Sequence, residues 1–357
     1  MKNVLIVRSA FSKLYESTWS RALNELGTRC RIFDTHAHCS NGLPGRIQQR
    51  ILWGPDISRV NRELIRTVKA SKPDVTLLYQ GNHYRPETIR ELRKHTFVAG
   101  YHNDDLLGPR KRMLRYRHVS RGLPFYDGYH VYRDCSVDDL TGAGVANAAV
   151  LMSHYVPWLD YPRTLSAEDR RRFDCDLIFA GHWEDDRRVE CLSAGVDKGI
   201  RVRVYGSQRY WTPTIPRKLR KDFDLLPIVH GEDYQKALCG SKIAACFLSK
   251  WNRDQYTRRV FEIPACGVFL LAERTPVMQQ LYDEGKEAEY FSTPEEFVSK
   301  GLFYLKNPAA RKRIAAAGHQ RATTSGYDVY SRMHQWIRDV GKWKRQHESE
   351  VPDSAAA

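Results

Sequence analysis

The chain has 357 residues, 42% of them hydrophobic and 11% aromatic, so it can bury substantial cores, and its length predicts two domains. No apolar run approaches the roughly 18 residues that span a bilayer, and residues 1–7 lack the features of a signal peptide, so we expect a cytoplasmic protein. The formal net charge is +15, with most of the excess in residues 1–165. This charge favours anionic partners such as nucleotide diphosphates, acidic glycans, membrane surfaces or nucleic acid, without choosing among them.

The eight cysteines are scattered along the chain and form no C-x-x-C pair. Several lie in apolar runs, as Cys246 does in residues 243–248. Such usage is typical of reduced cytosolic thiols, and it provides no zinc motif.

Short apolar runs alternate with amphipathic segments at the start of the chain, which predicts a Rossmann-like domain over residues 1–160. The expected strands are 4–8, 30–34, 74–79, 96–101 and 128–133, and the expected helices are 16–26, 58–70, 85–94 and 137–143. Residues 40–58 are rich in glycine and proline and are predicted to be an irregular segment that overhangs a cleft. The loop at 9–12 has no glycine, so the G-x-G-x-x-G motif is absent and a nicotinamide or flavin dehydrogenase is not expected.

The fourth predicted strand ends in a polar cluster that contains His102, Asp104 and Asp105. Ligands of open α/β sheets bind beyond the carboxyl ends of the strands. Acids and a histidine at this place are therefore candidates to contact an acceptor hydroxyl or to act as a general base. The alternative is that they are ordinary residues of a surface turn.

Residues 107–121 carry six cations and no acid, with Met113, Leu114, Tyr116 and Val119 interleaved. On a helix this pattern gives a basic, partly amphipathic face that suits an anionic membrane surface or a charged acceptor. A nucleic-acid groove has a similar composition. A solvated loop near the cleft is the remaining interpretation.

A second Rossmann-like domain is predicted over residues 173–325, after two prolines and a charged segment. The expected strands are 176–180, 200–206, 228–231, 242–248 and 268–272, the expected helices are 295–305 and 308–317, and residues 211–224 are expected to form a loop. A last amphipathic helix at 327–345 is expected to cross back to the first domain. Residues 346–357 are polar and small, and they are predicted to be a disordered tail.

The strand at 176–180 turns at Gly181 and is followed by His182, Arg187 and Arg188 at the start of a helix that runs to about residue 194. A helix start with nearby cations can hold a phosphate. The alternative is an exposed capping box with surface arginines.

The segment 252–275 is polar and rich in arginine at first, then forms a predicted helix at 257–266 and a buried strand. It contains two acids eight positions apart, Asp254 and Glu262. A carboxylate that accepts two hydroxyl hydrogen bonds is a good ribose anchor. The alternative makes Asp254 a helix cap and the arginines a solvated face.

The run from Arg259 through Glu262 to Gly267 reads RVFEIPACG; with Leu271-Ala-Glu-Arg-Thr and Gly285-Lys-Glu, it resembles the CgeB-like (spore-maturation-type) glycosyltransferases. The specific match covers residues 240–292, with looser similarity over 175–325. The resemblance implies the α/β GT-B fold of the Glu-x7-Glu group, in which two Rossmann-like, doubly wound domains face a central cleft. It places the first acid beside the donor sugar and the second on the ribose hydroxyls.

Carried over by position, the resemblance gives Asp254 the role beside the sugar and Glu262 the role on the ribose, although an Asp replaces the usual first Glu. It places one cation just after Gly181 and another at the start of the following helix, both near the donor phosphates. It places the nucleotide base near the connection before residue 232. The remaining donor-binding candidates are Lys250, Arg253, Arg258, Arg259, His182, Arg187, Arg188, His230 and Gly231. The usual first cation of the group is Arg where this chain has His182.

The resemblance implies a hexosyltransferase-type enzyme that moves a sugar from a nucleotide-diphosphate sugar to a hydroxyl of a glycan, lipid-linked or protein acceptor, in cell-surface polysaccharide or glycoconjugate synthesis. No metal is expected, because Asp174 and Asp176 precede their strand and therefore do not match the metal-binding Asp-x-Asp. Stereochemistry stays open, since many members of the group retain configuration, while Asp104 or Asp105 as a base permits inversion. The rivals are a nucleotide-sugar epimerase, a non-catalytic GT-B binding module, and, third, a basic nucleic-acid-binding protein. Nucleic acid is not an expected partner because no stacking motif is recognised.

Overall fold

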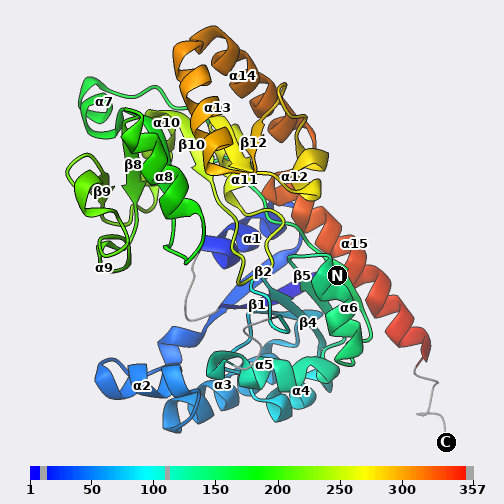
Figure 1. The fold of residues 1–357 in the computed structure, drawn as a ribbon. Coiled ribbons are helices and arrows are strands. Elements are labelled where there is room, and N and C mark those ends of the chain that lie inside the picture. Colours follow the sequence, from blue (N-terminus) through cyan, green and yellow to red (C-terminus); the bar gives the residue numbers. More distant parts are fainter. Residues whose placement is uncertain (9–13, 109–112, 351–357) are drawn as a thin grey trace, which may run out of the picture. The chain divides into compact units, whose positions relative to one another are not determined.

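The computed structural model describes residues 1–8, 14–108 and 113–350 and divides the chain into two compact units (Figure 1). Unit 1 contains Met1–Met152 and the C-terminal residues from Val329, and unit 2 contains Ser153–Asp328. Residues 153–160, which the sequence pattern assigned to the first domain, pack with unit 2.

Unit 1 is built on a six-stranded parallel sheet with the order β2-β1-β3-β4-β5-β6. The strands are β1 (Asn3–Arg8), β2 (Arg29–Asp34), β3 (Val75–Tyr79), β4 (Phe97–His102), β5 (Gly128–Val131) and β6 (Ala148–Val150). The helices are α1 (Leu14–Glu25), η1 (Thr35–His38), α2 (Leu43–Ile51), α3 (Pro55–Ser71), α4 (Pro86–Arg93), η2 (Leu114–Tyr116), α5 (Arg117–Gly122), η3 (Leu123–Phe125), α6 (Cys135–Gly142) and α15 (Val329–Glu350). Every residue of β3 and β4 is buried, as expected for central strands of a parallel sheet with helices on both faces.

Residues 40–58 are not irregular, and that prediction was wrong. They form α2 and the start of α3, each of which has a proline in its first turn and a glycine of positive φ just before the helix. Gly42 has φ 90° and Gly54 has φ 117°, which glycine adopts readily. Proline suits the first turn of a helix because the N–H that it lacks has no intrahelical partner there. The residues that were interpreted as helix breakers therefore start two helices.

Unit 2 is also a six-stranded parallel sheet, with the order β12-β11-β10-β7-β8-β9. The strands are β7 (Cys175–Ala180), β8 (Val202–Tyr205), β9 (Asp224–Leu226), β10 (Ser241–Cys246), β11 (Phe269–Glu273) and β12 (Glu289–Phe291). The helices are α7 (Ala167–Phe173), α8 (Arg188–Asp197), α9 (Gln208–Trp211), η4 (Arg217–Leu219), α10 (Glu232–Cys239), α11 (Arg259–Ala265), α12 (Pro276–Leu281), α13 (Pro294–Lys306) and α14 (Pro308–Thr324). In chain order this sheet has the 3-2-1-4-5-6 arrangement, whose switch point lies between β7 and β10.

Two details of unit 2 differ from the sequence-based expectation. The strand expected at 228–231 lies earlier, at β9, and residues 227–230 have no regular structure. The segment 211–224 is not a plain loop, because η4 lies within it and α9 ends at Trp211. Trp211 is completely buried in the hydrophobic core of this unit, which explains why an aromatic segment without a clear period is ordered.

The long helix α15 packs on unit 1 (red in Figure 1). Its Gln335 donates to the Val150 carbonyl at 2.8 Å, and its Asp339 lies 3.1 Å from Nε2 of buried His130. The helix continues through residues 346–350, which were predicted to be part of a disordered tail. The rest of that predicted tail, 351–357, lies outside the described residues.

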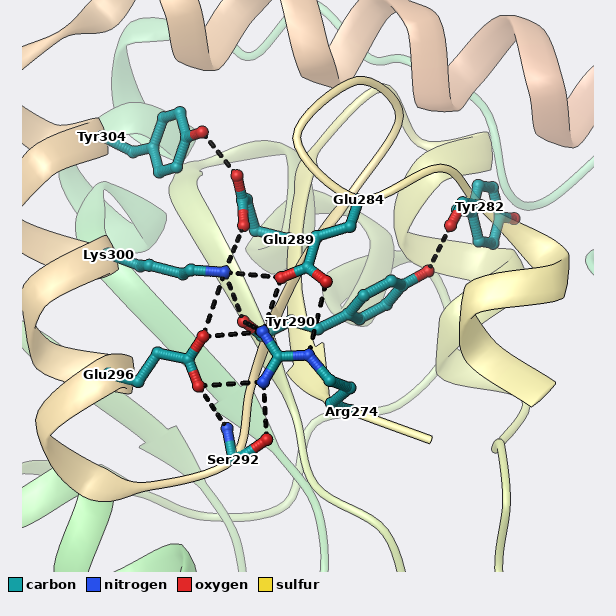
Figure 2. Close-up of polar contacts among 9 residues, drawn as sticks. All are labelled: Arg274, Tyr282, Glu284, Glu289, Tyr290, Ser292, Glu296, Lys300 and Tyr304. Carbon is teal, nitrogen blue, oxygen red and sulfur yellow. Dashed lines mark hydrogen bonds and ion pairs between the residues drawn. The ribbon is translucent and has the colours of Figure 1, made fainter. Parts of the chain in front are cut away.

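An ion-pair network holds the segment between β11 and α13 (Figure 2). The Arg274 guanidinium contacts Glu284 and Glu296, each at 2.6 Å, and Lys300 contacts Glu284 at 2.7 Å and Glu289 at 2.6 Å. The carboxylates hold the pKa of Lys300 above its usual value, against the opposing effect of its partial burial. Because two cations face three carboxylates, the cluster has no excess positive charge and is a structural clamp rather than an anion site.

Candidate functional site

The carboxyl ends of β7 and β10 lie side by side at the switch point of the unit 2 sheet. The loop that begins at Gly181 leaves β7, and residues 247–258 leave β10 and lead into α11. The two loops therefore flank the crevice in which ligands of such sheets bind.

Arg259, the first residue of α11, is a cation of this crevice without an ion-pair partner in the part of the chain that the structure describes. Its Nη2 lies 3.2 Å from where a Cβ on Gly181 would stand, and its Nε is buried without a hydrogen bond. Within the described residues, its guanidinium forms no ion pair. A partly buried guanidinium without a carboxylate partner is a ready contact for an anion.

His182 follows Gly181 and lies near the cations Arg259 and Arg188. Loss of hydration, together with the charges of Arg259 and Arg188, lowers the pKa of His182 below its usual value. The imidazole is therefore neutral at pH 7, and the positive charge beside Gly181 comes from Arg259.

Arg187 and Arg188 have different environments despite being adjacent. Arg188 is buried and binds Asp186 with two hydrogen bonds of 2.7 and 2.6 Å, and it also donates to the His182 carbonyl. Arg187 is exposed and donates to the Ser292 carbonyl at 2.6 Å. Arg188 therefore shapes the loop after β7, while both donor-binding assignments stay predictions.

Glu262 lies one turn into α11 and is 5% exposed. Its Oε2 accepts a hydrogen bond from the Tyr234 hydroxyl at 3.0 Å, and its Oε1 contacts Arg258 Nε at 2.7 Å. Burial keeps the pKa of Tyr234 well above its usual value, so this phenol stays a donor. A carboxylate oriented by two donors retains lone pairs for further hydroxyl groups.

A second buried acid lies behind Glu262. Asp160 accepts hydrogen bonds from the Val156 backbone and from Gln235, and its Oδ2 lies 3.8 Å from Arg258. Burial and the charge of Glu262 raise the pKa of Asp160. Asp160 and Tyr234 were not singled out from the sequence. Tyr234 stands three residues after the expected strand at 228–231, whereas no expected strand or helix adjoins Asp160.

Asp254 lies in the loop that follows β10. Its backbone N–H donates to the Ser249 carbonyl at 2.9 Å, and its Oδ2 accepts from the Ser249 N–H at 3.4 Å. Arg253 before it has the positive φ of 50°. Lys250, at the start of this tight loop, lies 3.5 Å from Glu273. The loop therefore has a defined, locally bonded shape, and the role of Asp254 stays a prediction.

The two residues predicted to lie near the nucleotide base stand immediately before α10. His230 and Gly231 are exposed, and Gly231 has φ 59° with open space around its Cβ position. Their positive-φ turn lies three residues before Tyr234, whose hydroxyl contacts Glu262. The turn and the ribose candidate are thus connected through one short helix.

In unit 1 the three candidate acceptor residues separate into different roles. His102 is fully buried and its Nδ1 accepts from the Asp104 N–H at 3.0 Å, while burial lowers its pKa to about 4. Asp105 is 1% exposed and caps the Gly108 N–H at 2.9 Å. Asp104 accepts from the Tyr116 hydroxyl at 3.0 Å and keeps 26% of its side chain exposed. Asp104 is therefore the acid of the three that solvent and a ligand can reach.

Asp174 and Asp176 lie at the amino end of β7, away from the carboxyl-end crevice, and pair with Arg201 and Lys242. Within residues 1–8, 14–108 and 113–350, no three His, Cys, Asp or Glu side chains are placed to hold a metal ion. Metal independence stays a prediction. Among the helices described, none is long and apolar enough to cross a membrane.

Comparisons with known proteins bear on the family and on the fold. Residues 187–338 match the family model described as glycosyl transferase-like. No protein of curated function matches the sequence.

Three similar solved structures share the fold at low sequence identity. Sucrose-phosphate synthase from Thermosynechococcus elongatus has a TM-score of 0.69 at 10% identity, covering 98% of this chain and 100% of the other. Anabaena Alr3699/HepE in complex with UDP-glucose has a TM-score of 0.66 at 11% identity, and it likewise covers 98% of this chain and 100% of the other. A Listeria monocytogenes protein assigned as a UDP-N-acetylglucosamine 2-epimerase has a TM-score of 0.59 at 10% identity, and the match covers 98% of each chain. The chain therefore has the GT-B fold of two Rossmann-like domains, and its residues 187–338 match the glycosyl transferase-like family.

Proposed function

We propose that this protein is a glycosyltransferase that moves a sugar from a nucleotide-diphosphate sugar to a hydroxyl acceptor. The match of residues 187–338 to the glycosyl transferase-like family and the GT-B fold support this function. The observation that carries it is the position of Arg259 beside Gly181, at the switch point of the unit 2 sheet. Its guanidinium has no ion-pair partner among the described residues.

In this proposal the Glu262 carboxylate accepts hydrogen bonds from the ribose hydroxyls, Asp254 lies beside the sugar, and Arg259 binds the diphosphate. Arg259 then stabilises the charge that develops on the departing diphosphate, which is the electrostatic part of catalysis. His230 and Gly231 lie near the nucleotide base. Asp104 in unit 1 contacts the acceptor hydroxyl.

Several finer features belong to the proposal. Membership of the CgeB-like group is supported by the residue pattern at 259–267, 271–275 and 285–287. We also propose a hexosyltransferase that needs no metal, acts in the cytoplasm and serves polysaccharide or glycoconjugate synthesis. A nucleotide-sugar epimerase is the second candidate, because a protein of the same fold carries that assignment.

A thermal-shift screen of the full chain with nucleotides is the direct test of the donor site. At one hundred times its dissociation constant, the correct nucleotide should stabilise the protein by about 2.7 kcal/mol. UDP is the first nucleotide to test, because the HepE structures contain it; GDP, CDP and dTDP complete the panel. We expect Glu262→Gln to remove the thermal shift, since the amide is a weaker ribose acceptor.

Glu232→Gln is the matched control, because Glu232 is on the adjacent helix α10 and its side chain is 64% exposed. Its nucleotide-induced shift should equal that of the wild type. A panel in which no nucleotide stabilises the wild-type protein, with or without magnesium, would remove the donor-site assignment.

We also propose that residues 107–121 contact an anionic membrane. Residues 109–112, which include Arg110, Lys111 and Arg112, lie outside the described residues. In the described part, Met113 is 41% and Leu114 48% exposed. Arg117 donates to the Leu52 carbonyl at 2.7 Å, which joins this segment to α2.

The neighbouring helix extends the apolar surface. Leu43, Ile47 and Trp53 are 68%, 49% and 66% exposed, and the first two share one face of α2. Exposed apolar side chains beside arginines favour the interface of an anionic bilayer.

We predict that Trp53→Ser lowers the affinity for phosphatidylglycerol vesicles about tenfold or more, since it removes one large apolar side chain from the bilayer interface. Flotation of the full chain with vesicles measures this. Phe303→Ser is the control, because Phe303 is 53% exposed on α13 in unit 2. Equal flotation of the two variants and the wild type would contradict membrane contact through this surface.

A further inference from the structure

Unit 1 contains a cavity of about 530 Å³ at the carboxyl ends of β3 and β4. Its volume lies in the range of small-molecule sites. The charged residues that line it are Arg46, Arg50, Arg115 and Asp104, and three amides complete its polar surface, Gln49, Gln80 and Asn82.

Among the described residues that line this cavity, three arginines face one aspartate, so the net charge of the lining is positive. Arg46 and Arg50 stand one turn apart on α2, and in the part of the chain that the structure describes neither guanidinium has a hydrogen-bond or ion-pair partner. Arg115 lies 3.5 Å from Asp104, so one carboxylate faces three cations. Two adjacent arginines repel each other unless an anion lies between them, and guanidinium pairs match the geometry of phosphate.

The polar end of the cavity has an unused acceptor. Asn82 is 5% exposed, and its Oδ1 is buried and accepts no hydrogen bond from the described residues. Gln80 has a φ of 63°, unusual for a residue with a side chain, and its Nε2 is held by Asn103 at 2.8 Å. Buried polar atoms are usually satisfied, and backbone strain of this kind gathers at binding sites.

We propose that this cavity binds an acceptor that carries a phosphate group near its reacting hydroxyl. Arg46 and Arg50 bind the phosphate, Asn82 accepts a hydrogen bond from a hydroxyl, and Asp104 lies at the reacting hydroxyl. The phosphate belongs either to a free polyol phosphate or to the headgroup of a phospholipid. The use of Asp104 rests on the proposed glycosyl transfer, whereas the binding of the phosphate does not.

The transfer step itself balances without a co-reactant. The acceptor oxygen forms a bond to the anomeric carbon of the donor sugar, and its proton passes to the Asp104 carboxylate. The bond between that carbon and the diphosphate oxygen breaks, and the nucleoside diphosphate leaves with the electron pair.

Calorimetric titration of the full chain tests the binding, with glycerol 3-phosphate and glycerol as probes. We expect glycerol 3-phosphate to bind and glycerol not to bind. The double variant Arg46→Gln/Arg50→Gln should raise the dissociation constant of glycerol 3-phosphate about thirtyfold or more. Arg62→Gln is the matched control, since Arg62 is an exposed arginine of α3 outside the cavity. It should bind as the wild type does.

A short-chain phosphatidylglycerol below its micellar concentration distinguishes the two phosphate sources. Tighter, arginine-dependent binding of this lipid assigns the headgroup, and tighter binding of glycerol 3-phosphate assigns the free compound. Absence of binding for both phosphate probes, or equal binding by wild type and double variant, overturns the proposal. The nucleotide-induced thermal shift of the double variant should equal that of the wild type, so a failed donor site is recognised separately.

Discussion

Arg259→Gln should lower kcat/KM for the nucleotide-sugar donor by about 10²- to 10³-fold, the effect of removing one preorganised contact to the developing charge. The guanidinium has no ion-pair partner in residues 1–8, 14–108 and 113–350, and it stands beside Gly181 at the end of β7. Hydrogen bonds to charged groups contribute about 1.5–3 kcal/mol each, so the dissociation constant of the bare nucleoside diphosphate should rise by roughly ten- to a hundredfold.

The same substitution should leave the fold nearly unchanged, with less than about 1 kcal/mol lost from the free energy of unfolding, because it breaks no ion pair of the described structure. Urea unfolding of the apoprotein checks this. Arg313→Gln is the kinetic control, since Arg313 is exposed on α14 and is not a donor-site candidate. We expect its kcat/KM to stay within about threefold of the wild type, an estimate that follows from the small effects of surface substitutions.

Arg188→Gln should behave in the opposite way. The side chains of Arg188 and Asp186 are 5% and 6% exposed, so the substitution leaves a buried carboxylate without its cation. Breaking a buried pair in this way costs about 3–5 kcal/mol of stability. If Arg259→Gln destabilises the apoprotein as strongly as Arg188→Gln does and leaves nucleotide affinity intact, Arg259 is structural and the phosphate assignment is wrong.

Most strands of both sheets could be predicted, because buried parallel strands read as continuous apolar runs. The short strands β6 and β12 were not expected, and β9 was expected at 228–231. Residues 74–79 and 96–101 were expected as strands, and the structure places β3 and β4 within one residue of those bounds at each end. The helix α2 could not be predicted, because its Gly42 and Pro44 are also the residues of loops. Only the surrounding structure decides whether such a pair starts a helix or interrupts one.

The partners of adjacent charged residues could not be predicted either. Arg258 and Arg259 are neighbours in the sequence, but consecutive helical residues point about 100° apart. Arg258 therefore faces Glu262 and Asp160, whereas Arg259 faces Gly181. The pair Asp104 and Asp105 separates in the same way, one toward a cavity and the other onto a loop N–H. The sequence spacing located the charged residues, but only the tertiary packing decides which of them face a crevice or cavity where a ligand can bind.

Asp104→Asn should lower kcat about 10²-fold while leaving nucleotide affinity unchanged, the lower part of the range for general-base catalysis. Burial tends to raise the pKa of Asp104, but His102, Arg115 and the Tyr116 hydroxyl outweigh it and hold that pKa below its usual value. A carboxylate of lowered pKa is a weaker base, which is why we expect the smaller effect.

The lowered pKa also fixes the direction of the pH dependence. The carboxyl of Asp104 is ionised at every pH above its usual pKa of about 3.9. Titration of Asp104 should therefore cause no change in kcat between pH 5 and 8. Its contribution to stability is present above pH 3.9 and is lost as the pH falls through the lower folded-state pKa. The Asn variant should lack this acid-induced loss, which unfolding measurements at pH 5 and pH 3 compare.

The stereochemistry of the product decides how the kinetic result for Asp104 is understood. An inverting transfer needs a base on the acceptor hydroxyl, so an inverted product together with a 10²-fold loss of kcat supports Asp104 in that role. Glu87→Gln is the control, because Glu87 lies in the first turn of α4 and does not line the cavity. A retained product with wild-type kcat in Asp104→Asn would show that this carboxylate is not the base. The lowered pKa would then reflect its contacts with Arg115 and Tyr116, which position the wall of the acceptor cavity.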